Sequence, residues 1–318
     1  MKKPLSVVFA GTPEFGLPCL EALLKSNHHL KAVYTQPDRG AGRGRRLQVS
    51  AVKKWAEQHL LPVYQPLNFK DPTTIQTLKA LAPDVMVVIA YGLILPQAVL
   101  DIPRFGCINV HASLLPRWRG ASPIQQAILH NDATSGITIM QMDAGMDTGA
   151  VIATTSYALA PFETAASLSE KLATLAAPLL MDVLDTYALA GKVSLTMQDH
   201  AKATLAKKIH KQDGQINWQN AASVIAQQIK AYNPWPIAYT TWMNTPLRIY
   251  RALVVESMAD TNKAPGTVLA VNREGIVVAT GQHALCLTDL QLPGGKPLKV
   301  TDWLNSNRPI IEQGQCLV

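Results

Sequence analysis

The 318-residue sequence predicts an α/β protein with a Rossmann-like, doubly wound parallel sheet, followed by a C-terminal β-barrel of the OB type. Two observations predict the first part: wholly apolar runs such as residues 5–10 and 85–90 read as buried parallel strands, and they alternate with helical segments. From residue 238 onward, short strands separated by turns replace this alternation, which is typical of a small barrel. We therefore expect two domains, at residues 1–189 and 209–318, joined by a linker at 190–208.

The elements of the first domain follow from capping residues and apolar patterns. Thr12 is expected to cap the first helix, with Pro13 in its first position. Asp71 and Pro72 are expected to begin a later helix in the same way. Strands are predicted at residues 5–10, 29–35, 61–65, 85–90, 106–111 and 136–142, and helices at 52–59, 71–80, 96–100, 123–129 and 168–187.

The second domain is predicted to begin with a helix at residues 221–231. Strands are predicted to follow at residues 247–255, 266–271, 276–280 and 284–290. Barrels of this kind often bind nucleic acid, but many do not, so the fold alone leaves the function open.

Residues 106–120 carry the most informative motif, because an apolar strand ends there in a loop. Asn109 and His111 are two residues apart, so their side chains are expected on one face of that strand. Ligands of open α/β sheets bind at the carboxyl ends of the strands. An amide next to an imidazole suits a reaction in which a carbonyl oxygen is held while a proton moves.

An Asp- and Gly-rich loop at residues 143–149 supplies the carboxylate that a catalytic histidine usually needs. Alone, such a loop is more often a simple turn, and it lacks the spacing of a calcium-binding loop, so no metal is expected. In transfer of an acyl group between nitrogens, Asn109 would donate to the oxyanion and His111 would move the proton, while Asp147 would hold the imidazole.

Composition limits the class of protein. Residues 1–189 carry a net charge of +2 and residues 190–318 carry +5, which fits either a polyanionic partner such as RNA or a merely basic domain. The four cysteines form no close pair, and Cys107 is expected to be a small buried strand residue. Without a long apolar run or a signal peptide, we expect a soluble cytoplasmic protein.

A basic arm is the second distinctive segment, since residues 39–46 hold four arginines and three glycines without an acidic residue. This composition predicts either a mobile arm that orders on phosphates or an ordinary solvated loop. A dinucleotide site is disfavoured, because Gly11 does not begin a G-x-G-x-x-G motif.

Together these segments resemble the methionyl-tRNA formyltransferases, a branch of the folate-dependent formyltransferases. The segments that carry the resemblance are residues 35–46, 87–96, 106–120, 141–149 and 231–236. The resemblance implies a formyltransferase fold and transfer of formyl from N10-formyltetrahydrofolate to the amino group of methionyl initiator tRNA. It also implies a monomer that acts in translation initiation, without a metal or a membrane partner.

The resemblance also assigns residues. Asn109, His111 and Asp147 match the catalytic trio of the family. The residues that match folate contacts, or border the pteridine, are Ser113, Leu114, Leu115, Pro116, Val88, Ile89, Tyr91 and Asp143. The residues expected to contact tRNA are Arg39, Arg43, Arg45 and Arg46 in the arm, and Lys207 and Lys208 after the linker.

Three alternatives remain open from the sequence. A formyltransferase for an amino sugar or amino nucleotide would share the trio but should lack the arginine arm. A tRNA-binding module without catalysis would keep Asn109 and His111 as core residues. A nicotinamide enzyme is the weakest alternative, given the missing glycine motif.

Overall fold

The computed structural model describes residues 3–41, 46–256, 263–306 and 309–318. Contacts within the chain divide it into two compact units. The first unit comprises Met1–Pro123, Thr134–Ala158 and Ser169–Ala206, and the second comprises Ile124–Ala133, Leu159–Leu168 and Lys207–Val318.

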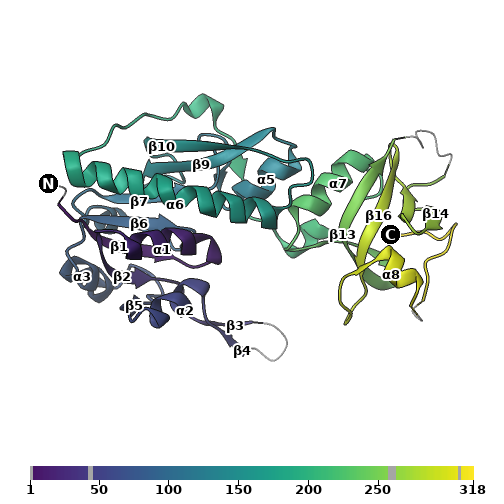
Figure 1. Ribbon diagram of the computed structural model, residues 1–318, viewed down its shortest axis with the longest axis horizontal. Coiled ribbons are helices and arrows are strands. Elements are labelled where there is room, and N and C mark those ends of the chain that lie inside the picture. Colours follow the sequence, from purple (N-terminus) through teal and green to yellow (C-terminus); the bar gives the residue numbers. More distant parts are fainter. Residues whose placement is uncertain (1–2, 42–45, 257–262, 307–308) are drawn as a thin grey trace. The chain divides into compact units, whose positions relative to one another are not determined.

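A seven-stranded sheet forms the centre of the first unit (Figure 1). Its strands lie in the order β10-β9-β7-β6-β1-β2-β5. Their bounds are Ser6–Gly11 for β1, His29–Tyr34 for β2, Val63–Tyr64 for β5, Val85–Ile89 for β6, Cys107–His111 for β7, Thr134–Gln141 for β9 and Val151–Ala158 for β10. Every residue of β6 is buried, as expected of an apolar strand at the centre of a parallel sheet.

The sheet is mixed, which differs from the predicted wholly parallel arrangement. Strands β5, β2, β1, β6 and β7 are parallel, but β9 pairs antiparallel with both β7 and β10. The loop between β9 and β10 is too short for the crossover that a parallel pair needs. Strand β10 was not predicted, because its residues are half exposed and partly polar, as on a sheet edge.

The helices of the first unit confirm the predicted start at Asp71 and Pro72 but not the one at Thr12 and Pro13. They are α1 at Leu17–Lys25, α2 at Ala51–Gln58, α3 at Pro72–Ala80, α4 at Gln97–Leu100 and most of α6 at Ala165–Ala190. The Asp71 side chain caps α3 by accepting from the Thr73 amide over 2.9 Å. The predicted cap at Thr12 is wrong: its hydroxyl donates to the Tyr91 carbonyl over 3.0 Å, and α1 begins only after a 3-10 turn, η1, at Glu14–Gly16.

Helix α6 is long and apolar enough to cross a membrane by length and composition alone. However, the first unit buries one side of α6, because four residues at helical spacing are all fully buried: Leu172, Ala176, Leu180 and Leu184. Figure 1 shows α6 running across the front of the sheet. We therefore interpret α6 as a core helix, which passes the same test.

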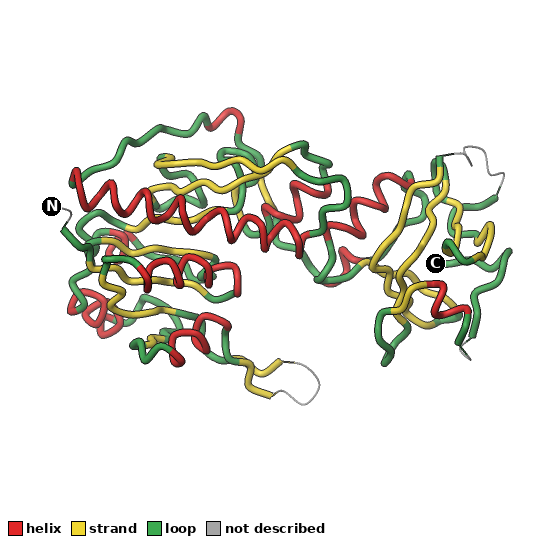
Figure 2. Tube along the Cα trace, in the orientation of Figure 1, coloured by secondary structure: helices red, strands yellow, loops and turns green. Residues whose placement is uncertain are grey.

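The arginine arm begins as a short hairpin on the first unit. Strand β3, Arg39–Ala41, pairs antiparallel with β4, Arg46–Gln48 (Figure 2). Arg43 and Arg45 lie outside the residues that the structure describes.

The segment after α6, predicted as part of a linker, makes specific contacts with the first unit. Thr196 forms an antiparallel bridge with Val151. After a 3-10 helix, η2, at His200–Lys202, strand β11, Leu205–Ala206, pairs in parallel with β8, Arg119–Gly120. The segment from the end of α6 to Ala206 therefore belongs to the first unit.

An antiparallel sheet forms the second unit, in the order β12-β13-β16-β15-β14 with β17 beside β16. The strands are β12 Ala238–Trp242, β13 Thr245–Val255, β14 Val268–Asn272, β15 Gly275–Ala279, β16 Ala284–Gln291 and β17 Leu298–Lys299. The helices are η3 Lys211–Gly214, α7 Ala222–Ala231, α8 Val300–Leu304 and most of α5 Pro123–Leu129. The predicted change to antiparallel strands is confirmed, whereas the OB type stays a prediction.

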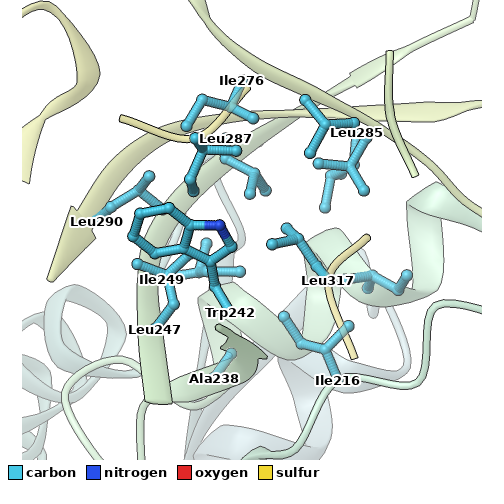
Figure 3. Close-up of a cluster of buried hydrophobic side chains, with 14 of the residues drawn as sticks. Ile216, Ala238, Trp242, Leu247, Ile249, Ile276, Leu285, Leu287, Leu290 and Leu317 are labelled. Carbon is cyan, nitrogen blue, oxygen red and sulfur yellow. The ribbon is translucent and has the colours of Figure 1, made fainter. Parts of the chain in front are cut away.

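The core of the second unit lies between this sheet and its helices. Trp242, Leu247, Ile249 and Leu287 are all buried there (Figure 3). The Trp242 ring packs edge-on against Trp303 of α8, with 5.9 Å between the ring centroids. The second unit thus has an apolar core of its own, as a separate domain requires.

Candidate active site

Strand β7 places Asn109 and His111 on the same face, as the alternation predicts. The strand lies between parallel β6 and antiparallel β9. His111 is buried, at 6% exposed, whereas Asn109 is partly exposed. The intervening Val110 points to the other face and is buried in the core. The two polar side chains are therefore held by an interior strand that is paired on both sides.

The carboxylate of Asp147 brings the predicted trio together. Its Oδ1 accepts from Asn109 Nδ2 over 3.2 Å, and its Oδ2 accepts from the backbone amide of Gly120 over 2.7 Å. Oδ2 also lies 3.7 Å from His111 Nδ1, which is within ion-pair range but beyond a direct hydrogen bond. An amide, an imidazole and a carboxylate thus meet at one place.

The other imidazole nitrogen has a different partner. His111 Nε2 lies 2.9 Å from the carbonyl oxygen of Trp118. Because a carbonyl oxygen only accepts, Nε2 must carry a proton in this arrangement. Nδ1, which faces Asp147, is therefore the nitrogen that is free to exchange a proton.

The loop that carries Asp147 is folded by its own side chains. Asp143 Oδ1 accepts from the Gly145 amide over 3.0 Å and from Thr148 Oγ1 over 2.6 Å. The backbone of Asp147 has a φ of +54°, in the left-handed region that favours glycine. Gly149 lies two residues further on, and a Cβ added at this glycine would lie only 1.7 Å from the Gln141 carbonyl oxygen. This close turn points the Asp147 side chain back toward β7.

The four residues after the strand, predicted to contact folate, form a loop tied to β9. Thr138 Oγ1 donates to the Ser113 carbonyl over 2.7 Å and accepts from the Leu115 amide over 3.0 Å. The Ser113 hydroxyl is buried and donates to the Arg117 carbonyl, so it serves the loop itself. Leu114 and Pro116 keep part of their apolar surface exposed, so they are the members of this group that can meet a ligand.

The predicted contacts at the end of β6 are largely core residues. Val88, Ile89 and Tyr91 are 6%, 0% and 2% exposed. The Tyr91 ring packs against Phe69, with 6.4 Å between centroids. Ala90, between Ile89 and Tyr91, is exposed and has a φ of +46°, so it is the residue that the strand end offers to a ligand.

The basic residues predicted to contact tRNA lie on exposed segments where the structure describes them. Arg39 is exposed, and its Nη2 donates to Gln36 Oε1 over 2.9 Å. Arg46 begins strand β4, opposite Ala41. Lys207 and Lys208 are exposed at the start of the second unit.

Two contacts at the site involve residues that sequence analysis did not single out. Gly120 supplies a backbone amide to Asp147, and Gln198 donates to the carbonyl oxygen of Asp147 over 2.9 Å. Gly120 ends the central motif and could have been suspected from it. Gln198 lies in a polar stretch without any local signal. Over the described parts of the chain, His, Cys, Asp and Glu form no group of three or more that could hold a metal ion.

Comparisons with known families cover both units. The sequence model described as "Formyl transferase" matches residues 5–184, and that described as "Formyl transferase, C-terminal domain" matches residues 208–308. Among curated relatives, the methionyl-tRNA formyltransferase of Legionella pneumophila (strain Paris) is 56% identical over 98% of this chain and 99% of its own length. That of Pseudomonas syringae pv. syringae (strain B728a) is 49% identical over 97% of this chain and 96% of its own.

Solved structures with a similar fold are far less similar in sequence. HypX from Aquifex aeolicus, in complex with tetrahydrofolic acid, matches 95% of this chain with a TM-score of 0.65 and 15% identity. The match covers 47% of HypX, so this chain spans about half of that protein. The N-formyltransferase from Helicobacter canadensis, in complex with folinic acid and dTDP-3-aminofucose, matches 89% of this chain and 99% of its own, with a TM-score of 0.64 and 17% identity. These two likenesses describe the fold alone.

Proposed function

The chain belongs to the formyltransferase family, and from this premise we propose that it transfers the formyl group of N10-formyltetrahydrofolate to the amino group of methionyl initiator tRNA. The observation that carries the proposal is the meeting of Asn109, His111 and Asp147 at the carboxyl end of β7. Formyl transfer to methionyl-tRNA is also the activity that the names of the full-length relatives state.

Asn109 supplies the donor for the oxygen that becomes negative. An asparagine amide has two N–H hydrogens, and Asp147 accepts one of them from Nδ2. The second is free to donate to the formyl oxygen as attack of the amine makes that carbon tetrahedral. Because Asp147 fixes the amide in advance, no reorganisation is needed when charge develops.

His111 and Asp147 handle the proton. The attacking amine must lose a proton, and the nitrogen that leaves the formyl group must gain one. Nδ1 of His111 is the imidazole nitrogen available for this exchange, because Nε2 is bonded to the Trp118 carbonyl. Asp147 Oδ2, at 3.7 Å, stabilises the imidazole when Nδ1 is protonated.

Formyl-folate supplies the activated formyl group when it is bound. The residues present fit a folate, since a ligand beside the trio would meet the partly exposed apolar surfaces of Leu114 and Pro116 and the exposed backbone at Ala90. Such surfaces suit the face of a flat ring, and Asp143 is exposed in the loop that carries Asp147.

We further propose that the arm, through Arg39, Arg43, Arg45 and Arg46, and Lys207 and Lys208 contact the tRNA. The exposure of Arg39, Lys207 and Lys208 supports this, because phosphate contacts need accessible cations. We also propose that the enzyme acts in the cytoplasm as a monomer, which light scattering of the purified protein at assay concentration would test.

The test of the proposed function is an acid-gel assay of charged initiator tRNA with the folate donor. We expect the wild-type protein to formylate methionyl-tRNA, and Asn109→Ala and His111→Ala each to lower the rate by about 10²- to 10⁴-fold. His29→Ala changes an exposed histidine elsewhere on the first unit and serves as the control. Wild-type rates for both site variants would refute the mechanism and favour a binding module without catalysis.

A second candidate function is formylation of an amino sugar nucleotide. The structure from Helicobacter canadensis holds dTDP-3-aminofucose, and the same trio would serve any amine. The assay therefore includes a dTDP-amino sugar as competing acceptor. Activity with the sugar nucleotide and none with methionyl-tRNA would replace the proposed substrate.

A further inference from the structure

Gln198 is a buried glutamine outside the predicted site. One end of its side-chain amide bonds to the loop that carries Asp147, and the other end bonds to the buried cation of Arg119. Gln198 is 6% exposed. Its Oε1 accepts from Arg119 Nε over 3.0 Å and from Arg119 Nη2 over 2.7 Å. Its Nε2 donates to the carbonyl oxygen of Asp147 over 2.9 Å and to that of Gly149 over 2.7 Å. Both ends of this amide are thus occupied, one by the cation and one by the catalytic loop.

The orientation of this amide is determined by its neighbours. A guanidinium only donates, and backbone carbonyls only accept. Turning the Gln198 amide over would place its NH₂ group against Arg119 and its oxygen against the carbonyls of Asp147 and Gly149, which would lose four hydrogen bonds in a buried place. Arg119, itself 6% exposed, therefore orients Gln198.

Asp147 is a residue that needs such support. Its φ of +54° is unfavourable for a side chain with a Cβ and persists only where the surroundings enforce it. The bonds from Gln198 hold the carbonyls of Asp147 and of Gly149, two residues further on. They fix the peptide group that follows Asp147 and the one that follows Gly149, and with them the direction in which the Asp147 side chain leaves the loop.

The same stretch of chain also supports the His111 side of the site. Thr204 accepts from the Trp118 amide through Oγ1 over 2.9 Å, and its carbonyl accepts from the Arg119 amide over 2.9 Å. The carbonyl oxygen of Trp118 accepts the hydrogen bond from His111 Nε2. Residues 196–206, which we call the clamp segment, therefore hold the carbonyls of Asp147 and Gly149 on one side and the amides of Trp118 and Arg119 on the His111 side.

We propose that Gln198 is a positioning residue for Asp147 in formyl transfer, that Arg119 orients it, and that the clamp segment is thereby part of the catalytic centre. This inference rests on the proposed function. A merely structural Gln198 would satisfy Arg119 and stabilise the fold, with no particular effect on the step that Asp147 serves. The two roles differ in which kinetic constant changes and in whether the effect depends on Asp147.

The first test is Gln198→Met, which keeps the length of the side chain and removes all four hydrogen bonds. We expect kcat to fall by roughly 10- to 100-fold, the effect of a small displacement of a catalytic group, while KM for both substrates stays within about threefold. Gln58→Met, at an exposed glutamine of α2, is the matched control and should keep wild-type constants. A kcat for Gln198→Met within about twofold of wild type would overturn the proposal.

The second test asks whether the effect passes through Asp147. Single-turnover rates are compared for Asp147→Ala with and without Gln198→Met, using enzyme in excess. Because a positioning residue has nothing to position once the carboxylate is gone, we expect the second substitution to change the rate by less than about threefold. The same fold loss in both backgrounds would show independent, structural action and overturn the proposal.

The third test guards against misfolding. Gln198→Glu keeps an oxygen acceptor for Arg119 but lacks the two hydrogens that Nε2 donates to the loop. We expect a cooperative thermal unfolding transition, because the carboxylate still pairs with Arg119, together with a kcat lowered by roughly tenfold or more. Wild-type kcat in this variant would overturn the proposal. Failure of the proposed function itself would be distinct, since the wild-type protein would then not formylate methionyl-tRNA at all.

Discussion

The side-chain amide of Asn109 donates to Oδ1 of Asp147 over 3.2 Å, although 38 residues separate the two in sequence. A carboxylate only accepts, so the contact fixes which end of the amide is the NH₂ group. One carboxylate therefore orients the proposed oxyanion donor through Oδ1 and lies beside the imidazole through Oδ2. Loss of Asp147 should consequently affect both proposed catalytic groups, Asn109 and His111.

Asp147→Asn tests this double role. The two carboxylate oxygens accept from two different donors, Asn109 Nδ2 and the Gly120 amide, so an asparagine must place its own NH₂ group against one of them. We expect kcat to fall by about 10²- to 10⁴-fold with little change in KM, measured by steady-state formylation. Asp101→Asn, at an exposed aspartate of the same unit, is the control. A variant that keeps kcat within about threefold of wild type would contradict the role.

Gly149→Ala tests the turn that aims Asp147. A Cβ there would lie 1.7 Å from the Gln141 carbonyl oxygen, so the loop must move. We expect a loss of about 1–3 kcal/mol in the free energy of unfolding, together with a lowered kcat. Gly191→Ala is the matched control: its φ is +68° with no atom within 4 Å of the added Cβ, so it should cost about 1–2 kcal/mol and leave kcat unchanged. Equal kcat in the two variants would argue against the loop's role.

The sequence predicts those parts of the site that depend on local geometry. Asn109 and His111 share a face because strand residues alternate, and Asp147 was found because a histidine that moves protons needs a carboxylate. The contacts of Gln198 were beyond prediction, since they join segments that only tertiary folding brings together. Thr12 failed as a cap for the same reason, because a distant carbonyl, that of Tyr91, takes its hydroxyl.

The fold was predictable wherever burial leaves a pattern in the sequence. Strand β6 is wholly buried and reads as a continuous apolar run, so it was placed almost to the residue. Strand β10 alternates between exposed and partly buried positions at the sheet edge and carries polar residues, so its pattern resembles that of a loop. The antiparallel direction of β9 depends on pairing between distant strands and leaves no mark in its own residues.

Cys107 is predicted to take no part in the chemistry, although it lies two residues before Asn109. Burial, with a smaller contribution from Asp101, raises the pKa of Cys107 to about 12, so the thiol stays protonated at pH 8. We expect an alkylating reagent at pH 8 to modify the exposed Cys316 and to spare Cys107, with formylation activity retained. Mass mapping of the modified cysteines checks this, and activity loss that tracks alkylation of Cys107 would contradict it.

Arg43→Ala tests the proposed role of the arm in tRNA use. If the arm binds phosphates, removal of one cation should weaken tRNA binding without altering the site on the sheet. We expect a higher KM for methionyl-tRNA, a smaller salt dependence of kcat/KM, and unchanged folate binding. An unchanged dependence of the rate on tRNA concentration would contradict this role.

Asp38 ties the base of the arm to the first unit. Its Oδ2 accepts from Lys53 Nζ over 2.6 Å, and its Oδ1 accepts from Gln65 Nε2 over 2.8 Å, immediately before β3. The hydrogen bond from Lys53, and to a smaller extent that from Gln65, lowers the pKa of Asp38 below its usual range. The Asp38 carboxylate should therefore keep these two bonds as pH falls and lose them only below the pKa of an ordinary aspartate.

Asp38→Ala should therefore act on tRNA use from a distance. Without the bonds of Asp38 to Lys53 and Gln65, the base of the hairpin is free and the arm must be ordered when tRNA binds. KM for tRNA should therefore rise by roughly 3- to 10-fold. Because the side chain of Asp38 bonds to Lys53 and Gln65 and not to Asn109, His111 or Asp147, kcat at saturating tRNA should stay near wild type. The double variant Asp38→Ala, Arg43→Ala tests whether Asp38 acts through the arm. If it does, the losses in kcat/KM for tRNA, expressed as free energies, should be less than additive. Fully additive losses would assign Asp38 another role.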